Sequence, residues 1–457
     1  MQAPMGPATS DESSSAGGSV AHSRPELIRA IGRWALTAIV INSVIGSGIF
    51  GLPSALAGHV GAWSPVAVLV AGSSIFVIVL CFAEVGSRFD QAGGPYLYAR
   101  EAFGPAVGFQ VGWLHVWTRL LSAAAVLNVL VAYVAALLPW AATPSGRAVT
   151  MIFGMALVTA VNMRGVREAA WTVNVFTVAK LLPLVVLAVV GGFQIRSDVL
   201  DTQAVPQPDW TEAVLLLVFA YGGFESAVIA ASETRNPKRD TAFALVVAMI
   251  AVTAVYCLVQ LAVVGVLPNA ARSTAPVAAT LRELFGPAGS TLGSVAVIVS
   301  VYGWLTGFAL MTPRILFSMA ERNELPAFFG RVHPRFRTPN SAIFINSSVA
   351  LALGLASGFT QLATFSAISR LGLFASTCVA LIVLRKRWGE SPGFLLPGGR
   401  VAAVAGVAFC LWLLSTRTLA QAWFLPVVLA TGAVVWGLTR RMRRAAVAPG
   451  SVTNQDT

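Results

Sequence analysis

The chain has 457 residues, of which 56% are hydrophobic and 11% carry charge, whereas soluble domains contain about 25% charged residues. Charged residues are absent from the 50 positions between Arg33 and Glu84, from residues 241–271 and from residues 284–313. Each run exceeds the roughly 20 residues that cross a bilayer as a helix. The sequence therefore predicts an all-α membrane protein and excludes a soluble enzyme.

The net charge of +12 would suit a nucleic-acid-binding protein, but the positions of the charges argue against that function. With twelve spans, 23 of the 31 lysines and arginines fall at one side of the membrane, five at the other and three inside spans. Positive residues accumulate on the cytoplasmic side of membrane proteins. We therefore expect a multi-pass protein of the cytoplasmic membrane with both termini in the cytoplasm, and no nucleic-acid partner.

Residues 1–32 are rich in small and polar residues and are predicted to be a disordered cytoplasmic tail. Twelve spans are then expected, at residues 34–57, 64–87, 105–138, 148–163, 170–193, 211–232, 242–267, 288–320, 341–357, 361–384, 401–416 and 420–439. They are followed by a cytoplasmic C-terminal tail, residues 441–457. The four cysteines lie in apolar runs without a CxxC partner, so no metal or other cofactor is predicted.

Glycines interrupt the first and sixth spans at corresponding places, Ile45-Gly46-Ser47-Gly48 and Tyr221-Gly222-Gly223-Phe224. Paired interruptions in two halves point to a transporter built from inverted repeats, with its site at the membrane midplane. An unwound helix exposes backbone amides and carbonyls that a polar ligand can satisfy and hydrocarbon cannot. The alternative is that these glycines only allow close helix packing.

These interrupted segments resemble the amino acid–polyamine–organocation superfamily of permeases. The resemblance extends from residue 33 to residue 440 through motifs in the family's order: Gly46 to Phe50, Ala92-Gly93-Gly94-Pro95-Tyr96, Phe103-Gly104-Pro105, Gly223-Phe224-Glu225, Asn236-Pro237-Lys238-Arg239, Leu325-Pro326, His333-Pro334-Arg335 and Thr338-Pro339. It implies a fold similar to that of the leucine transporter. Residues 33–193 and 209–387 would be two inverted five-helix repeats, and residues 400–440 would add two helices.

The resemblance also implies where an amino acid substrate binds. Its carboxylate would lie on the break in helix 1, at Ser47, Gly48 and Ile49. Its ammonium group would meet backbone carbonyls at Val44, Phe219 and Gly222. This split agrees with helix polarity, because helix N-termini attract anions and carbonyl ends attract cations. The aromatic residues Phe219, Tyr221 and Phe224 would either form walls of the pocket or only pack against other helices.

Lys180 lies in the middle of the fifth span, where a lysine costs roughly 2.5–3.5 kcal/mol on insertion scales. Burial favours the neutral amine, so the lysine is a candidate for proton coupling. In sodium-independent relatives such a lysine resembles a stand-in for the sodium ion and binds carbonyls of broken helix 1, here near Ile45 and Gly46. The alternative is a permanently charged lysine that only holds helices together.

Other ionisable residues inside the spans also break the apolar pattern. Glu225 follows the second break and would anchor helix 6, bind substrate or move protons. Arg119 in the third span would lie beside the substrate side chain, repelling cations and pairing with anions, or would only satisfy carbonyls between helices. Arg370 is expected to share acceptors with Arg119. Glu84, near the cytoplasmic end of its span, is expected to reach water.

The function predicted from these features is secondary transport of amino acids by alternating access, most simply symport of neutral amino acids with protons. Exchange of amino acids, or transport of anionic amino or organic acids using Arg119, are the alternatives. A membrane-embedded enzyme is disfavoured because the spans contain one histidine, His115, and no HExxH or GxSxG motif. A receptor is disfavoured because the tails are too short to fold as a signalling domain.

Overall fold

A computed structural model of the chain describes residues 31–89, 93–164, 166–201, 203–229, 234–334, 336, 338–389 and 393–447. Most of the expected N-terminal tail, the end of the C-terminal tail, and Ala92 and Arg335 of the family motifs lie outside the described residues.

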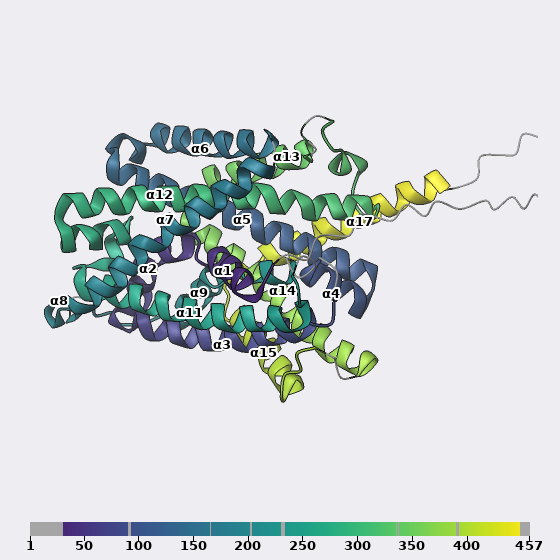
Figure 1. The fold of residues 1–457 in the computed structure, drawn as a ribbon, viewed down its shortest axis with the longest axis horizontal. Helices are drawn as coiled ribbons and strands as arrows, with labels where there is room; N and C mark the ends of the chain where they lie inside the picture. Colours follow the sequence, from purple (N-terminus) through teal and green to yellow (C-terminus); the bar gives the residue numbers. More distant parts are fainter. Residues whose placement is uncertain are drawn as a thin grey trace, which may run out of the picture.

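The described part of the chain is helical, and its only β feature is an isolated bridge between Ile31 and Thr234. Most of the long helices run along the long axis of the molecule (Figure 1). The α-helices are α1 (Arg33–Val44), α2 (Ser47–Val60), α3 (Ser64–Gly86), α4 (Gly94–Phe103), α5 (Pro105–Leu137), α6 (Pro144–Arg164), α7 (Val166–Phe193), α8 (Ser197–Asp201), α9 (Trp210–Ala220), α10 (Glu225–Ile229), α11 (Pro237–Val266), α12 (Pro276–Glu321), α13 (Asn340–Ala356), α14 (Phe359–Trp388), α15 (Gly399–Ser415), α16 (Leu419–Ala422) and α17 (Phe424–Val447).

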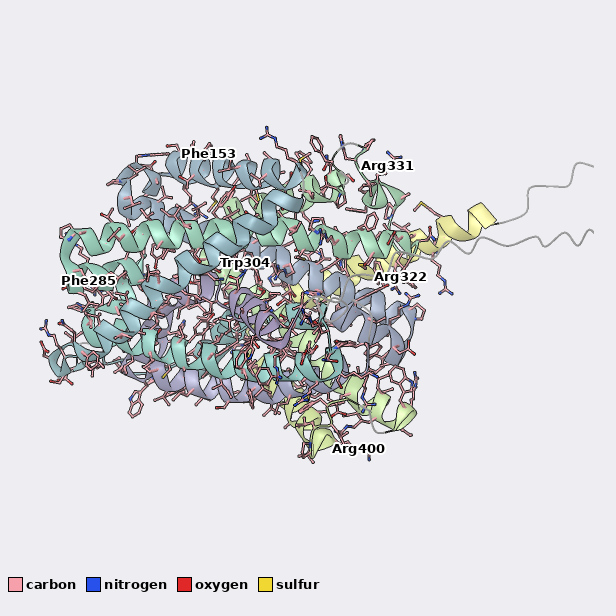
Figure 2. The ribbon with its side chains drawn as sticks, in the orientation of Figure 1. Phe153, Phe285, Trp304, Arg322, Arg331 and Arg400 are labelled. Atoms are coloured by element: carbon pink, nitrogen blue, oxygen red, sulfur yellow. The ribbon has the colours of Figure 1, made fainter. Side chains whose placement is uncertain are left out.

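Eight helical stretches of the described chain are long and apolar enough to cross a membrane. Four shorter apolar helices, Arg33–Val44, Lys180–Phe193, Asn340–Ala356 and Gly399–Ser415, fall within other expected spans. Large apolar side chains such as Phe153, which is 69% exposed, face outward from the bundle (Figure 2). Such a surface suits lipid rather than water. The chain is therefore an all-α, multi-pass membrane protein, and the count of twelve spans stays a prediction.

Helix α5 packs against α12, α13 and α14, and α3 packs against α11. The predicted length of the third span is confirmed, because α5 runs over 33 residues. The helix assigned as α12 contains a sharp bend at Gly286, where φ is 70°. A residue with a side chain rarely adopts this backbone conformation, and the expected eighth span begins just after the bend.

Both predicted helix interruptions are present. The first lies at Ile45 and Gly46, between α1 and α2, and the second covers residues 221–224, between α9 and α10. Within the second, Gly223 has a φ of +119°, which favours glycine strongly. The glycines singled out in the sequence thus coincide with places where the helical hydrogen-bond pattern stops.

The expectation for Glu84 is wrong. Its side chain is fully buried and forms ion pairs with Arg88 at 2.9 Å and Arg385 at 2.5 Å. It also accepts a hydrogen bond from the Leu396 amide at 3.0 Å. Arg385 is separated from Glu84 by 300 residues of sequence, so a reading of the second span alone could not find this partner.

Candidate functional site

The C-terminal end of α1 carries carbonyl oxygens that no continuing helix can satisfy. Lys180 of α7 donates to two of them, the Asn42 oxygen at 2.5 Å and the Ile45 oxygen at 2.8 Å. The Lys180 side chain is buried, and a cation is favourable at the negative end of a helix dipole. The lysine therefore holds the first helix break, and one of its acceptors, Ile45, is a residue named by the sequence prediction.

A tyrosine joins the ends of the two broken helices. The Tyr256 hydroxyl of α11 lies 2.9 Å from the Val44 carbonyl oxygen and 3.1 Å from the Ala220 carbonyl oxygen, and its one proton serves both. Val44 ends α1 and Ala220 ends α9. The Val44 carbonyl, predicted to receive a substrate ammonium group, thus already has a donor in this structure.

The N-terminal end of α2 offers backbone amides instead of carbonyls. The helix begins at Ser47, and no side chain caps it. The first amides of a helix lack acceptors within the helix and lie at its positive end. Ser47, Gly48 and Ile49, predicted to receive a carboxylate, are all buried in this first turn. A β-carbon at Gly48 would lie 2.7 Å from the Ala220 α-carbon, so only glycine allows α2 and α9 to approach this closely.

The second helix break packs against the first. A β-carbon at Gly223 would collide with the Ser43 carbonyl oxygen of α1. Glu225 folds back on the break and accepts from the Gly223 amide at 2.7 Å. Its other oxygen pairs with Arg370 of α14 at 2.6 Å, and both side chains are about 5% exposed or less. The Glu225 carboxylate, predicted to bind substrate, is therefore already paired with Arg370. These contacts are those expected if Glu225 anchors helix 6.

Arg370 also lies directly against the second break. A β-carbon at Gly222 would overlap the Arg370 guanidinium group, so the guanidinium packs on the backbone of this glycine. The Arg370 Nε atom is buried and has no hydrogen-bond partner among the described residues. The carbonyl oxygen of Phe219 accepts from the Gly222 amide at 3.2 Å. Three carbonyls are predicted to bind a substrate ammonium group. Those of Val44 and Phe219 already accept hydrogen bonds, and the third residue, Gly222, is covered by the Arg370 guanidinium group.

Among the described residues, Arg119 of α5 lies near the first break and contacts Trp304, whereas Arg370 pairs with Glu225. The Arg119 guanidinium carbon is 5.1 Å from the centroid of the Trp304 ring, a favourable cation–π contact. Trp304 lies midway along α12 (Figure 2) and packs on Gly46, where a β-carbon would be 2.9 Å from the indole nitrogen. Arg119 forms no ion pair with any carboxylate of the described residues. His115, one turn earlier, is buried.

The aromatic residues of the second break mostly pack within the bundle. Phe224 lies between Phe82 and Phe374, with ring centroids 5.1 Å away in both pairs. The Tyr221 hydroxyl donates to the Val68 carbonyl at 3.0 Å. Phe219 is 6% exposed and meets Phe359 edge-on. In this structure Tyr221 and Phe224 therefore pack against other helices, as expected if they do not form walls of the pocket.

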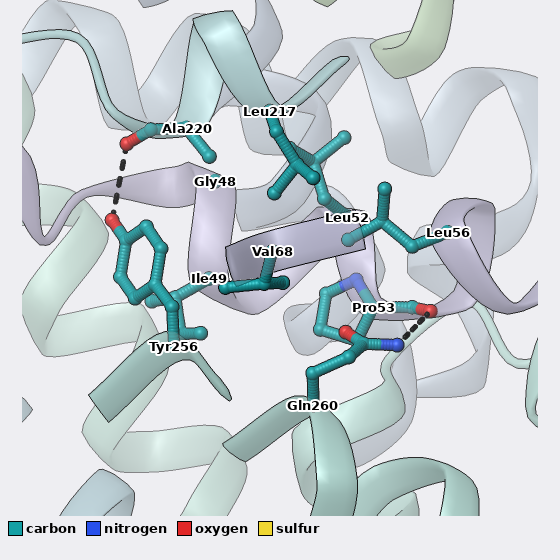
Figure 3. A pocket seen from close by; sticks show the side chains of 10 residues that line it. All are labelled: Gly48, Ile49, Leu52, Pro53, Leu56, Val68, Leu217, Ala220, Tyr256 and Gln260. Carbon is teal, nitrogen blue, oxygen red and sulfur yellow. Dashed lines mark hydrogen bonds between the residues drawn. The ribbon is translucent and has the colours of Figure 1, made fainter. Parts of the chain in front are cut away.

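A small cavity lies between α2, α3, α9 and α11, next to Gly48 (Figure 3). Its polar edges are the Tyr256–Ala220 hydrogen bond and the hydrogen bond from Gln260 to the Pro53 carbonyl at 3.1 Å. The room for a water centre is only about 10 Å³, roughly one water molecule. An amino acid can enter this space only if the surrounding helices move apart.

Sequence reasoning missed three residues that shape this centre: Tyr256, Trp304 and Asn42. Tyr256 stands in the charge-free run of residues 241–271, where a hydroxyl group needs a hydrogen-bond partner in hydrocarbon. This need for a partner is the one sign in the sequence that Tyr256 has a structural role. Nothing in the sequence indicates that the partner is the end of a broken helix.

Comparison with known proteins agrees with this architecture. A family model described as "Amino acid permease" matches residues 31–439. The serine/threonine exchanger of Bacillus subtilis is 29% identical over 433 residues, covering 89% of this chain and 96% of the relative. A branched-chain amino acid permease of the same organism is 26% identical over 85% of this chain and 88% of the relative. A methylthioribose transporter, also from B. subtilis, is 26% identical over 90% and 91%.

These relatives are transporters rather than enzymes, and their similarity covers most of the chain. The residues matched by the family model, 31–439, span both helix breaks. The resemblance noted from the sequence motifs is confirmed. The chain is a membrane transport protein that belongs to the amino acid permease family.

Proposed function

We propose that this permease carries an amino acid across the cell membrane by alternating access, with the substrate bound between the two helix breaks. The observation that carries the proposal is the opposed polarity of the breaks. The first turn of α2 presents uncapped amides, which suit a carboxylate, while the ends of α1 and α9 present carbonyl oxygens within reach of Tyr256. A substrate ammonium group would replace the tyrosine proton at these oxygens.

We propose a topology with two inverted repeats, residues 33–193 and 209–387, and two added helices in residues 400–440. Both termini would be cytoplasmic, because the basic residues accumulate on that side. The broken helices would move against the rest of the bundle. The tight contacts of Gly48 with Ala220 and of Gly223 with Ser43 support this mechanism, because they let the two breaks move as one packed unit.

Proton coupling would use Lys180. While protonated, its ammonium group ties α7 to the Asn42 and Ile45 carbonyls. Loss of the proton removes one of the three N–H donors and the positive charge, so the hold on α1 weakens. The Lys180 ammonium group lies where the family resemblance implies a sodium ion in other members, which favours coupling to protons. The transporter would then work as a symporter.

Neutral amino acids are the first candidate substrates. A second class, anionic amino or organic acids, is favoured by a specific observation: Arg119 lies near the first break without a carboxylate partner among the described residues. Glu225 is paired with Arg370, which leaves Arg119 without a counter-charge in an ion pair among the described residues, so an added anion would balance this charge. Cationic substrates are disfavoured because the same positive charge would repel them.

Exchange is the alternative to symport, and one relative is itself named an exchanger. The test is uptake by proteoliposomes of a labelled panel of neutral, anionic and cationic amino acids, with and without an inward proton gradient. Symport predicts accumulation that depends on the gradient. Uptake that ignores the gradient and requires an internal amino acid would contradict symport and favour exchange. No uptake or exchange of any amino acid would contradict the proposed substrate class.

A further inference from the structure

A second, larger cavity lies at the end of the bundle opposite to α8. Its volume is about 330 Å³, at the lower end of the range for sites that bind small molecules. It lies where α4, the start of α5, the end of α12 and α17 meet, and Figure 2 shows Arg322 at this end of the molecule beside α17. Its lining includes Arg100, Pro105, Ala106, Arg322, Glu324 and Arg440.

The lining carries three arginines and one carboxylate. Glu324 is buried, pairs with Arg100 and accepts from the Tyr96 hydroxyl at 2.7 Å. Arg322 lies over the Tyr96 ring, 5.6 Å from its centroid. Within the part of the chain that the structure describes, neither Arg322 nor Arg440 forms an ion pair. The cavity therefore keeps two positive charges that no lining carboxylate balances.

Tyr96 adds no negative charge to this site. Burial, together with its hydrogen bond to Glu324, raises the pKa of Tyr96 to about 12. The phenol therefore stays protonated at neutral pH and acts as a donor to Glu324. The excess of positive charge is a property of the arginines alone.

Backbone donors add to the attraction for an anion. Pro105 and Ala106 form the first turn of α5, a helix of 33 residues that no side chain caps. Pro105 has no amide proton, so Ala106 is the lining residue that offers a free backbone amide; it lacks an acceptor within the helix and lies at the positive end of the dipole. Guanidinium groups and helix amides together suit phosphate oxygens, because guanidinium groups can bind phosphate with two parallel hydrogen bonds.

The surface beside the cavity indicates where such a phosphate comes from. Val434, Leu438 and Met442 are 60%, 55% and 57% exposed. Their spacing of four residues places them on one face of α17, next to the lining residues Trp436, Thr439 and Arg440. A soluble phosphate ion makes no use of an apolar stripe, whereas the acyl chains of a lipid do.

We infer that this cavity binds a phosphate-bearing anion, the headgroup of an anionic phospholipid whose acyl chains lie along α17. Basic pockets between helices on the cytoplasmic side of membrane proteins bind such headgroups. The side follows from the proposed topology. The site itself does not depend on which amino acid is carried, because none of its lining residues belongs to the helix breaks.

The test is native mass spectrometry of the full-length protein with phosphatidylglycerol and with phosphatidylcholine of the same acyl chains. The wild type should retain phosphatidylglycerol in preference. Arg440→Gln should weaken this binding about fivefold, the effect of one arginine near an anionic lipid surface, and Arg322→Gln with Arg440→Gln roughly 25-fold. Arg441→Gln is the matched control, since Arg441 is exposed on the same helix but does not line the cavity.

Equal binding of the two lipids, or an equal loss in the Arg440→Gln and Arg441→Gln variants, would overturn the inference. Inorganic phosphate at millimolar concentration is the third probe. It should not displace phosphatidylglycerol, and displacement would overturn the lipid source in favour of a soluble phosphate compound.

Discussion

Replacing Lys180 tests how the first helix break is held. Lys180→Ala removes the hydrogen bonds to Asn42 and Ile45, at 2.5 and 2.8 Å. Hydrogen bonds to charged groups contribute about 1.5–3 kcal/mol each, so roughly 3–6 kcal/mol of contact between α7 and α1 is lost. Removing a lysine from the middle of a span regains roughly 2.5–3.5 kcal/mol. These effects largely cancel, so the variant should fold while α1 loses its attachment.

The assay is accumulation of labelled substrate in proteoliposomes with an inward proton gradient. Lys180→Ala should lose gradient-driven accumulation but retain exchange of internal for external substrate. Lys180→Arg should also lose accumulation, because a guanidinium group keeps its charge at physiological pH. Lys386→Ala is the matched control, as Lys386 is exposed in the last turn of α14, and it should accumulate substrate like the wild type.

Two results would refute this reasoning, and they differ in meaning. Full accumulation by Lys180→Ala would show that the residue does not couple transport to protons. Full accumulation by Lys180→Arg, with loss in Lys180→Ala, would show that a permanent positive charge is sufficient. Lys180 would then only hold α1 in place.

Three further variants test other parts of the structure. Arg119→Gln should weaken the binding of anionic amino acids about tenfold or more, which is the contribution of one charge-assisted hydrogen bond. It should also allow cationic amino acids to bind. Unchanged selectivity in competition assays would show that Arg119 is structural. Tyr256→Phe should lower the free energy of unfolding by about 1 kcal/mol or more, seen as a lower melting temperature, because two buried carbonyls lose their donor. Asp209 caps α9 by accepting from the Glu212 amide at 2.9 Å, so Asp209→Ala should cost about 1 kcal/mol. Burial raises the pKa of Asp209, but its hydrogen bonds with Glu212 and Thr211 outweigh this and lower the pKa overall. The cap therefore stabilises above the usual aspartate range and is lost below about pH 4, so the melting temperatures of wild type and variant should converge in acid.

The helix breaks could be predicted because glycine acts locally. Gly46 and Gly223 interrupt apolar runs, and the need to satisfy freed backbone groups follows from hydrocarbon alone. Lys180 could be predicted for a similar reason, since a lysine in the middle of a span requires acceptors nearby. Each of these features depends mainly on its own stretch of sequence.

Pairings between distant segments could not be predicted. Glu225 meets Arg370 and Glu84 meets Arg385 across long separations, so their partners depend on how the helices pack. The short helix α4 was also missed, since its ten residues contain two tyrosines, an arginine and a glutamate and lack the apolar length of a span. The contact of α4 with Glu324 depends on how the helices pack together, so it could not be predicted from the sequence of α4 alone.

The measurement that tests the central claim most directly is equilibrium binding of a labelled amino acid to wild type and to two glycine variants of α2. In Gly48→Ala, the new β-carbon would lie 2.7 Å from the Ala220 α-carbon, whereas in Gly58→Ala it meets only an ordinary contact at 3.7 Å. If an amino acid binds between the helix breaks, Gly48→Ala should lose binding and Gly58→Ala should retain it, with both eluting as folded protein in size-exclusion chromatography. Wild-type affinity in Gly48→Ala would contradict a site between the breaks.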